Sequence, residues 1–142
     1  MAHKITGSLV VVLLLVLMPA AAQDQAVSVD SLYTQSGIEY GNGNYQESIR
    51  LMRLAASHQE TISGPRSLEY AEIVDDLGFV LTDVQEYEEA EEKITLALTI
   101  RRELSSPDSL DLGDSFENLA RLYARTGELE RAEASFEEAR VY

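Results

Sequence analysis

A periodic self-similarity is the feature of this sequence that most constrains its fold, because a chain of repeated segments folds as a stack of similar units. When the chain is shifted along itself by 42 residues, like residues coincide. The coincident pairs are Pro65 and Pro107, Ser67 and Ser109, Leu77 and Leu119, Ala90 and Ala132, and Ala97 and Ala139, with Tyr45 and Tyr87 one unit earlier. We therefore expect three related units, at about 30–64, 65–106 and 107–142.

Inside each unit, apolar residues recur every three or four positions, which is the rhythm of a helix with one buried face. The second unit holds two such stripes: Leu68, Ala71, Val74, Leu77, Gly78, Leu81 and Val84, then Tyr87, Ala90, Ile94, Ala97 and Leu98. The segment 83–86 interrupts the rhythm between these stripes, and Gly127 separates the two stripes of the third unit. Pro65 and Pro107 are expected where a helix begins, because proline lacks the N–H that is unpaired there. Each unit is thus predicted to be a helix–turn–helix hairpin.

Small residues occur at three fixed places in the hairpins, where they would let paired helices approach closely. They are Gly78 or Ala120 in the first helix, and Ala90 or Ala132 and Ala97 or Ala139 in the second. This pattern resembles the tetratricopeptide repeat, which residues 117–123 and 127–133 match almost position by position. The longer period resembles the long-helix variety found in kinesin light chains. Armadillo or HEAT repeats are the alternative, but they do not account for the small residues.

The resemblance implies an all-α fold, a right-handed superhelical array of helix–turn–helix hairpins (an α-solenoid) with about three repeats. In the first unit the register stays open, because Ser36 and Gly37 occupy a place where one small residue is expected.

The first 22 residues differ from the rest of the chain and predict a secretory signal peptide. Lys4 gives a basic start, residues 9–18 are all apolar, and Pro19 is followed by three alanines. Cleavage is expected before Gln23, which leaves a short linker at 23–29 and a repeat domain at 30–142. The protein would then be exported, to the periplasm or outside the cell, with no membrane segment after cleavage. An uncleaved anchor is the alternative.

Composition excludes several classes of function. The chain has no Cys, which removes disulfides and thiolate zinc sites, and its net charge of −14 opposes binding to nucleic acid. After residue 22, His58 is its only imidazole. The glutamates at 86–92 are expected on a solvated helix face, and 108–119 lacks the ligands of a calcium loop. We expect no catalytic residue, no metal and no cofactor, and hence a protein that is not an enzyme.

In the resembled family, the first helices of the hairpins line a concave groove that is the usual ligand site. The resemblance implies that the stripe not used for packing faces this groove. Its binding residues would be Tyr33, Tyr40, Glu72, Asp75, Asp76, Phe79, Asp83, Asn118, Arg121 and Arg125, with Asp114 and Glu117 beside them. Phe79 is the expected apolar anchor. Asn118, Arg121 and Arg125 would form half of a carboxylate clamp, and a groove split in charge would suit an extended peptide of mixed charge.

We therefore interpret the chain as an exported, non-catalytic module that binds a protein or peptide. The alternative is the N-terminal sensing or scaffold part of a longer multidomain envelope enzyme or signalling protein, because Tyr142 is expected inside the last helix. An uncovered helix face near Leu129, Phe136 and Ala139 predicts self-association.

Overall fold

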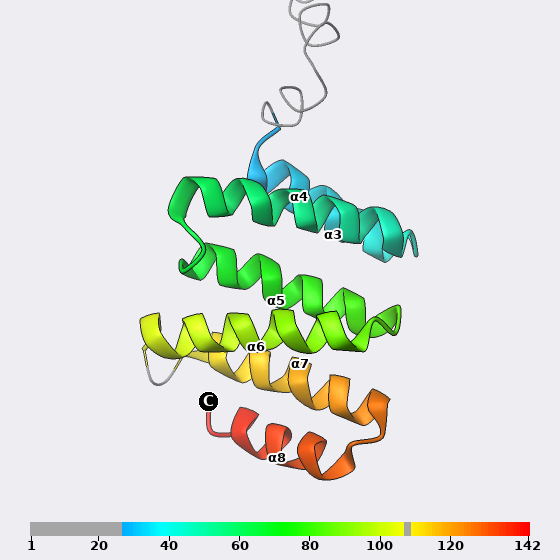
Figure 1. Ribbon diagram of the computed structural model, residues 1–142, viewed down its shortest axis with the longest axis vertical. Helices are drawn as coiled ribbons and strands as arrows, with labels where there is room; N and C mark the ends of the chain where they lie inside the picture. The colour runs from blue at the N-terminus through cyan, green and yellow to red at the C-terminus, as the bar shows by residue number, and fades with distance from the viewer. Residues whose placement is uncertain (1–26, 107–108) are drawn as a thin grey trace, which may run out of the picture.

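The structure is a computed structural model and describes residues 27–106 and 109–142. The described residues form helices and no strand. The helices are α3 (Val29–Gly41), α4 (Tyr45–Ser63), α5 (Leu68–Asp83), α6 (Tyr87–Leu104), α7 (Leu110–Thr126) and α8 (Leu129–Ala139). Figure 1 shows them stacked along the long axis of the molecule, with the hairpin of α3 and α4 at one end and α8 at the other.

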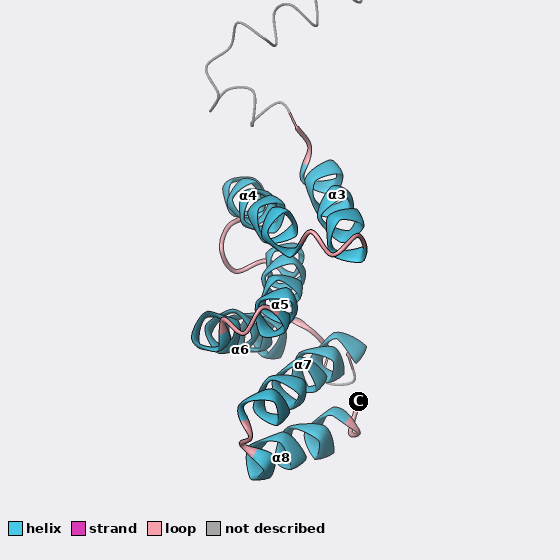
Figure 2. Cartoon of the chain, turned by 90° about the vertical axis from the view of Figure 1, so that its right-hand side faces the viewer, coloured by secondary structure: helices cyan, strands magenta, loops and turns pink. Residues whose placement is uncertain are grey.

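Successive helices pair into three hairpins, α3 with α4, α5 with α6, and α7 with α8. The hairpins stack because α4 also packs on α5 and α6 on α7, as Figure 2 shows from the side. The first helices α5 and α7 touch one another directly as well. The predicted fold class, an all-α solenoid of helix–turn–helix repeats, is confirmed.

The three hairpin turns share one unusual backbone conformation. Gly43, Gln85 and Gly127, which occupy equivalent places in the three units, have φ angles of 80°, 67° and 83°. Glycine adopts this left-handed region without penalty, whereas the Cβ of Gln85 makes it unfavourable. The predicted turns at 83–86 and at Gly127 lie where α5 and α7 end.

Two predicted helix boundaries are wrong. Helix α5 begins at Leu68, and its cap is Ser67, whose side chain accepts a hydrogen bond from the Tyr70 N–H. Pro65 therefore lies in the connection before the cap and not in the first turn, while Pro107 lies outside the described residues. At the other end, α8 stops at Ala139. Tyr142 follows the turn at 140–141 and stacks on the Phe116 ring, with 6.0 Å between ring centroids.

The small residues sit where helices of one hairpin meet. A Cβ placed on Gly78 would lie 2.5 Å from Cγ1 of Ile94, so only glycine permits this approach of α5 to α6. In the first hairpin, Ser36 is fully buried while Gly37 has open space around it. Ser36 is therefore the small residue of that unit, which settles the register that the sequence left open.

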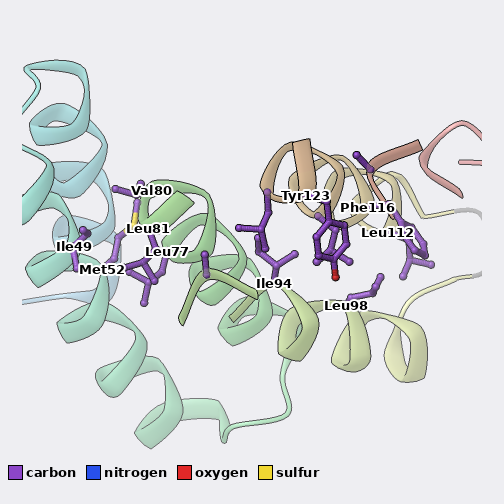
Figure 3. Close-up of a cluster of buried hydrophobic side chains, with 14 residues drawn as sticks. Ile49, Met52, Leu77, Val80, Leu81, Ile94, Leu98, Leu112, Phe116 and Tyr123 are labelled. Atoms are coloured by element: carbon purple, nitrogen blue, oxygen red, sulfur yellow. The ribbon is translucent and has the colours of Figure 1, made fainter. Parts of the chain in front are cut away.

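Apolar side chains fill the space between the hairpins in two clusters. One extends from α3 to α6 and includes Leu32, Ala55 and Val74. The other, drawn in Figure 3, extends from α4 to α8 and includes Ile49, Leu81, Ile94, Phe116 and Tyr123. Burial of these side chains at about 25 cal/mol per Å² is the main force that holds one hairpin on the next.

None of the helices in the described part of the chain is long and apolar enough to cross a membrane. The predicted signal peptide, at 1–22, lies outside the described residues.

Candidate peptide-binding groove

The face formed by the first helices α3, α5 and α7 is hollowed in two places. The larger cavity, of about 590 Å³, lies between α3, α5 and α7. A second hollow of about 490 Å³ continues along α7 and reaches Phe136 of α8. Of the predicted groove residues, Tyr33, Tyr40, Glu72, Asp75, Asp76, Phe79 and Asn118 line the larger cavity. Phe79, Asn118, Arg121 and Arg125 line the second hollow.

Asp75 is the centre of a buried polar group, here called the Asp75 cluster, with Arg101, Ser115 and Asn118. Its Oδ2 accepts hydrogen bonds from Arg101 Nη1 at 2.5 Å, Ser115 Oγ at 3.3 Å and Asn118 Nδ2 at 3.2 Å. The side chain of Asp75 is only 2% exposed and that of Arg101 only 7%. Asp75 therefore lines the cavity with almost none of its side chain exposed, because its stripe of α5 is covered by α7 and by Arg101 from α6.

Sequence reasoning did not select Arg101, although the sequence carried a signal for it. The apolar stripe of α6 runs through Ile94, Ala97 and Leu98, and its next position falls on Arg101. A charged residue on a buried stripe requires a partner of opposite charge. The partner is Asp75, and Arg101 Nη1 also donates to the Asp111 carbonyl and to Ser115 Oγ.

Burial raises the pKa of both aspartates of α5 that line the cavity. Loss of solvent raises the pKa of Asp75 to about 6, and the Arg101 guanidinium only partly offsets this. Burial also raises the pKa of Asp76, although a hydrogen bond from the Tyr33 hydroxyl favours its charged form. Burial and that same carboxylate raise the pKa of Tyr33 far above its ordinary value, so its hydroxyl stays a donor. These groups thus join α3 to α5 and α5 to α7.

A second polar group, the Asp83 cluster, lies at the far end of α5 and includes Tyr40, Arg121 and Arg125. The Tyr40 hydroxyl donates to Asp83 Oδ2 at 2.8 Å. Arg121 and Arg125 both donate to Asp83 Oδ1, at 2.5 and 3.2 Å. Both guanidinium groups of the predicted half-clamp are therefore already paired with an acid of the chain, and the clamp itself stays a prediction.

Phe79 lies between the two clusters and lines both hollows. The guanidinium carbon of Arg121 lies 4.0 Å from the centre of the Phe79 ring, a cation–π contact. The Tyr40 ring is tilted against the same ring, with 5.7 Å between centroids. Phe79 is thus half-buried by its neighbours, and its remaining apolar surface lies at the junction of the two hollows.

The larger cavity carries an excess of carboxylates. Besides Asp75 and Asp76 it is lined by Glu69, Glu72, Asp111, Asp114 and Glu117, and Arg101 is the one basic residue among the described residues that line it. Within the described residues, no salt bridge reaches any of the last five acids. The described part of the chain has no group of acidic or histidine side chains arranged to hold a metal ion. This cavity therefore has unneutralised negative charge.

Stacked helical hairpins with a hollowed face define a helical repeat protein. Residues 73–140, from within α5 to the end of α8, match the tetratricopeptide repeat family. Among solved structures, BtubC (BKLC) from P. vanneervenii is similar, with a TM-score of 0.75 and 20% sequence identity. The likeness covers 84% of this chain and 49% of that chain, so this chain spans about half of the structure that it matches. The search of the curated proteins found no match.

Residues 73–140 are thus similar to the tetratricopeptide repeat family, and the fold is that of a helical repeat protein. Repeats of this family generally mediate protein–protein interactions and are typically non-catalytic. The particular groove residues predicted above stay a prediction as binding residues, and the structure gives only their places.

Proposed function

We propose that this protein is an exported, non-catalytic scaffold module that binds an extended segment of a partner protein in the groove of α3, α5 and α7. The observation that carries the proposal is the position of Phe79, a half-buried aromatic ring at the junction of two adjoining hollows. A large apolar side chain that is left partly open inside a polar concavity is typical of a binding anchor.

The dimensions of the groove favour an extended segment over a globular surface. The cavity of about 590 Å³ has room for a few side chains, and the second hollow of about 490 Å³ adjoins it through Phe79 and Asn118. A segment lying across both would contact α3, α5 and α7 in turn. Such a segment can place alternate side chains into successive hollows while the rest of the partner stays outside.

The test is to capture partners on the repeat domain from an envelope fraction and to measure their affinity by calorimetry. Phe79→Ala is expected to lower affinity by at least tenfold, since the loss of an aromatic anchor costs about 2 kcal/mol. Glu92→Ala is the matched control, because Glu92 is an exposed residue of α6 outside the groove. Circular dichroism checks that both variants fold, and Phe79→Leu gives a milder second change. Wild-type affinity of Phe79→Ala would show that the groove is the wrong surface.

Export is part of the proposal and is supported by the sequence of the first 22 residues, with their basic start, apolar run and three alanines. Membership of the long-period variety of repeat, which resembles kinesin light chains, is also part of the proposal and is supported by the 42-residue period. Intact-mass measurement of the protein from the envelope or secreted fraction tests export. Removal of residues 1–22 is the expected result, whereas a full-length mass in the membrane pellet would contradict it.

The alternative, a scaffold part of a longer multidomain protein, rests on the sequence and stays a prediction. Helix α8 and the turn after it expose apolar side chains that a further helix or a second copy would cover: Leu129 is 70% exposed, Phe136 47% and Val141 76%. We propose self-association through this face. Light scattering over a range of concentrations tests it, and a monomer at every concentration would contradict it.

A further inference from the structure

We propose that the partner segment is basic, and that a Lys or Arg side chain of the segment enters the cavity between α3, α5 and α7 while a neighbouring apolar residue contacts Phe79. This inference rests on the proposed function and adds to it the chemistry of the partner. The inferred basic segment differs from the segment of mixed charge that the sequence predicted. Among the described residues of the groove, the arginines are paired and only carboxylates lack an ion pair.

The first observation is the distribution of unpaired charge. The two arginines of the Asp83 cluster are paired with Asp83, and Arg101 is paired with Asp75. By contrast, Glu72, Asp114 and Glu117 line the cavity from α5 and α7 without a salt bridge in the described part of the chain. An approaching cation would meet several carboxylates in one concavity, where their fields add.

The second observation is an unsatisfied acceptor in the lining of the cavity. Asp75 accepts all three of its side-chain hydrogen bonds on Oδ2, from Arg101, Ser115 and Asn118. Its other oxygen, Oδ1, is buried and has no partner in the described structure. A buried carboxylate oxygen without a donor is unfavourable by about 1–3 kcal/mol. Because this oxygen is closed off from solvent, it adds negative potential at the cavity wall, where a cation that enters meets it together with the open carboxylates.

The helix geometry also predicts the spacing of the partner's residues. Glu72 and Phe79 lie on the same face of α5 and both line the cavity, separated by about 10 Å along the helix axis at 1.5 Å per residue. An extended chain covers this distance in about three residues. The segment should therefore carry its basic residue about three positions from its apolar residue.

The experiment uses an array of short synthetic peptides and the full repeat domain. Each peptide carries one leucine and a pair of lysines, and the distance between the leucine and the lysines varies from one to five residues. Matched peptides carry glutamate or glutamine in place of lysine. The strongest lysine peptide is then labelled with fluorescein, and its binding is followed by fluorescence anisotropy at low and at physiological salt. A lysine peptide with the intermediate spacing is expected to bind at least tenfold more tightly than its glutamate counterpart.

Two variants of equal charge separate the cavity from the general acidity of the chain. Glu72→Gln with Asp114→Asn removes two negative charges from the cavity, and Glu88→Gln with Glu92→Gln removes two from the exposed face of α6. The cavity variant is expected to lose about tenfold in affinity for the lysine peptide. The α6 variant is expected to lose less than about twofold, because distant exposed charges are screened. Circular dichroism verifies the fold of both.

Equal losses in the two variants would overturn the inference, because binding would then follow net charge alone. A glutamate peptide that binds as well as the lysine peptide would also overturn it. If that binding still falls with Phe79→Ala, the groove remains the binding surface and only the basic partner is wrong. If no peptide binding depends on Phe79, the proposed function itself fails.

Discussion

Helix α5 carries two aspartates, about two turns apart, that meet arginines in different surroundings. In the Asp75 cluster the acid and Arg101 are almost fully buried. In the Asp83 cluster the acid is 12% exposed and its two arginines, Arg121 and Arg125, are 32% and 48% exposed. Both clusters join the first helices of neighbouring hairpins, so they have the same structural role and differ mainly in their contact with water.

That difference in exposure determines how much each ion pair contributes to the stability of the fold. Water screens the Asp83 pairs, so each contributes little and each can be lost at little cost. The Asp75 pair has lost its water, and the raised pKa of Asp75 shows that burial costs the carboxylate more than Arg101 returns. A buried pair of this kind is costly to break because the remaining charge has no partner. Ion-pair distance alone therefore does not rank these contacts, since both aspartates have a partner at 2.5 Å.

The largest effect is expected from breaking the buried pair. Arg101→Met should lower the free energy of unfolding by about 3–5 kcal/mol at pH 8, because it leaves the Asp75 carboxylate buried without a counter-charge. Chemical denaturation with urea measures the loss. The double variant Arg101→Met with Asp75→Asn should recover part of it. A loss below about 1 kcal/mol would mean that the pair is as weak as an exposed one.

The next effect is a pH dependence that belongs to the buried cluster. The folded pKa of Asp75, about 6, lies above its unfolded value of about 3.9. Its contribution to stability is therefore fully present below the unfolded pKa and is lost as pH rises through 6. The free energy of unfolding should rise on going from pH 8 to pH 5, by on the order of 1–3 kcal/mol from this group.

The falling net charge of an acidic chain acts in the same direction, so the difference between variants is the informative quantity. Thermal melts of Asp75→Asn should depend less on pH than those of the wild type. Glu92→Gln, on the exposed face of α6, should keep the wild-type slope. Equal slopes in Asp75→Asn and the wild type would contradict the assignment to Asp75.

A smaller effect is expected at the acid of the exposed cluster. Asp83→Asn keeps the shape of the side chain but removes the charge that Arg121, Arg125 and Tyr40 share. We expect a loss of about 1–2 kcal/mol by urea denaturation, since Asp83 accepts hydrogen bonds from charged donors but is partly solvated. Glu130→Gln, at an exposed position of α8, is the control. A loss as large as that of Arg101→Met would remove the distinction between the two clusters.

The smallest effect is expected for a single arginine of that cluster. Arg125→Ala should cost less than about 1 kcal/mol, because Arg125 is half-exposed and Arg121 keeps its pair with Asp83. The loss should shrink further in high salt, where exposed charges are screened. Melts at low and high salt measure both effects. A loss that does not depend on salt would indicate that packing of the Arg125 side chain is the source.

Much of the fold was predictable because its signals are local. Helix periodicity, a glycine at the turn and the repeated small residues each depend on neighbours within one hairpin, and they led to the right class of fold. The boundaries that failed depended on finer local chemistry. Ser67 caps α5 by a side-chain hydrogen bond, which displaces the helix start from Pro65. The register of the first hairpin became clear only from the burial of Ser36, which the sequence alone does not reveal.

The positions of the groove residues were predictable from the sequence, but their burial and their ion pairs were not. The sequence placed Phe79, Asp83 and Arg121 on the groove-facing stripes of their helices, and the structure finds these side chains together on the hollowed face. Their mutual pairing was not foreseen, since Asp83 and Arg121 belong to different hairpins. Arg101 was missed for a related reason. It belongs to α6, the second helix of its hairpin, and its side chain reaches the cavity from there, between α5 and α7.

The sequence by itself determined which segments become helices, where the chain turns and which face of each helix is apolar, because these properties depend on residues a few positions apart. The tertiary structure alone decided which charges stay free and which are neutralised. That outcome depends on how closely one hairpin stacks on the next, and on the exclusion of water from the space between them. Removal of water turned Asp75 from an expected groove charge into a buried structural pair, while Glu72 on the same helix kept an unpaired charge.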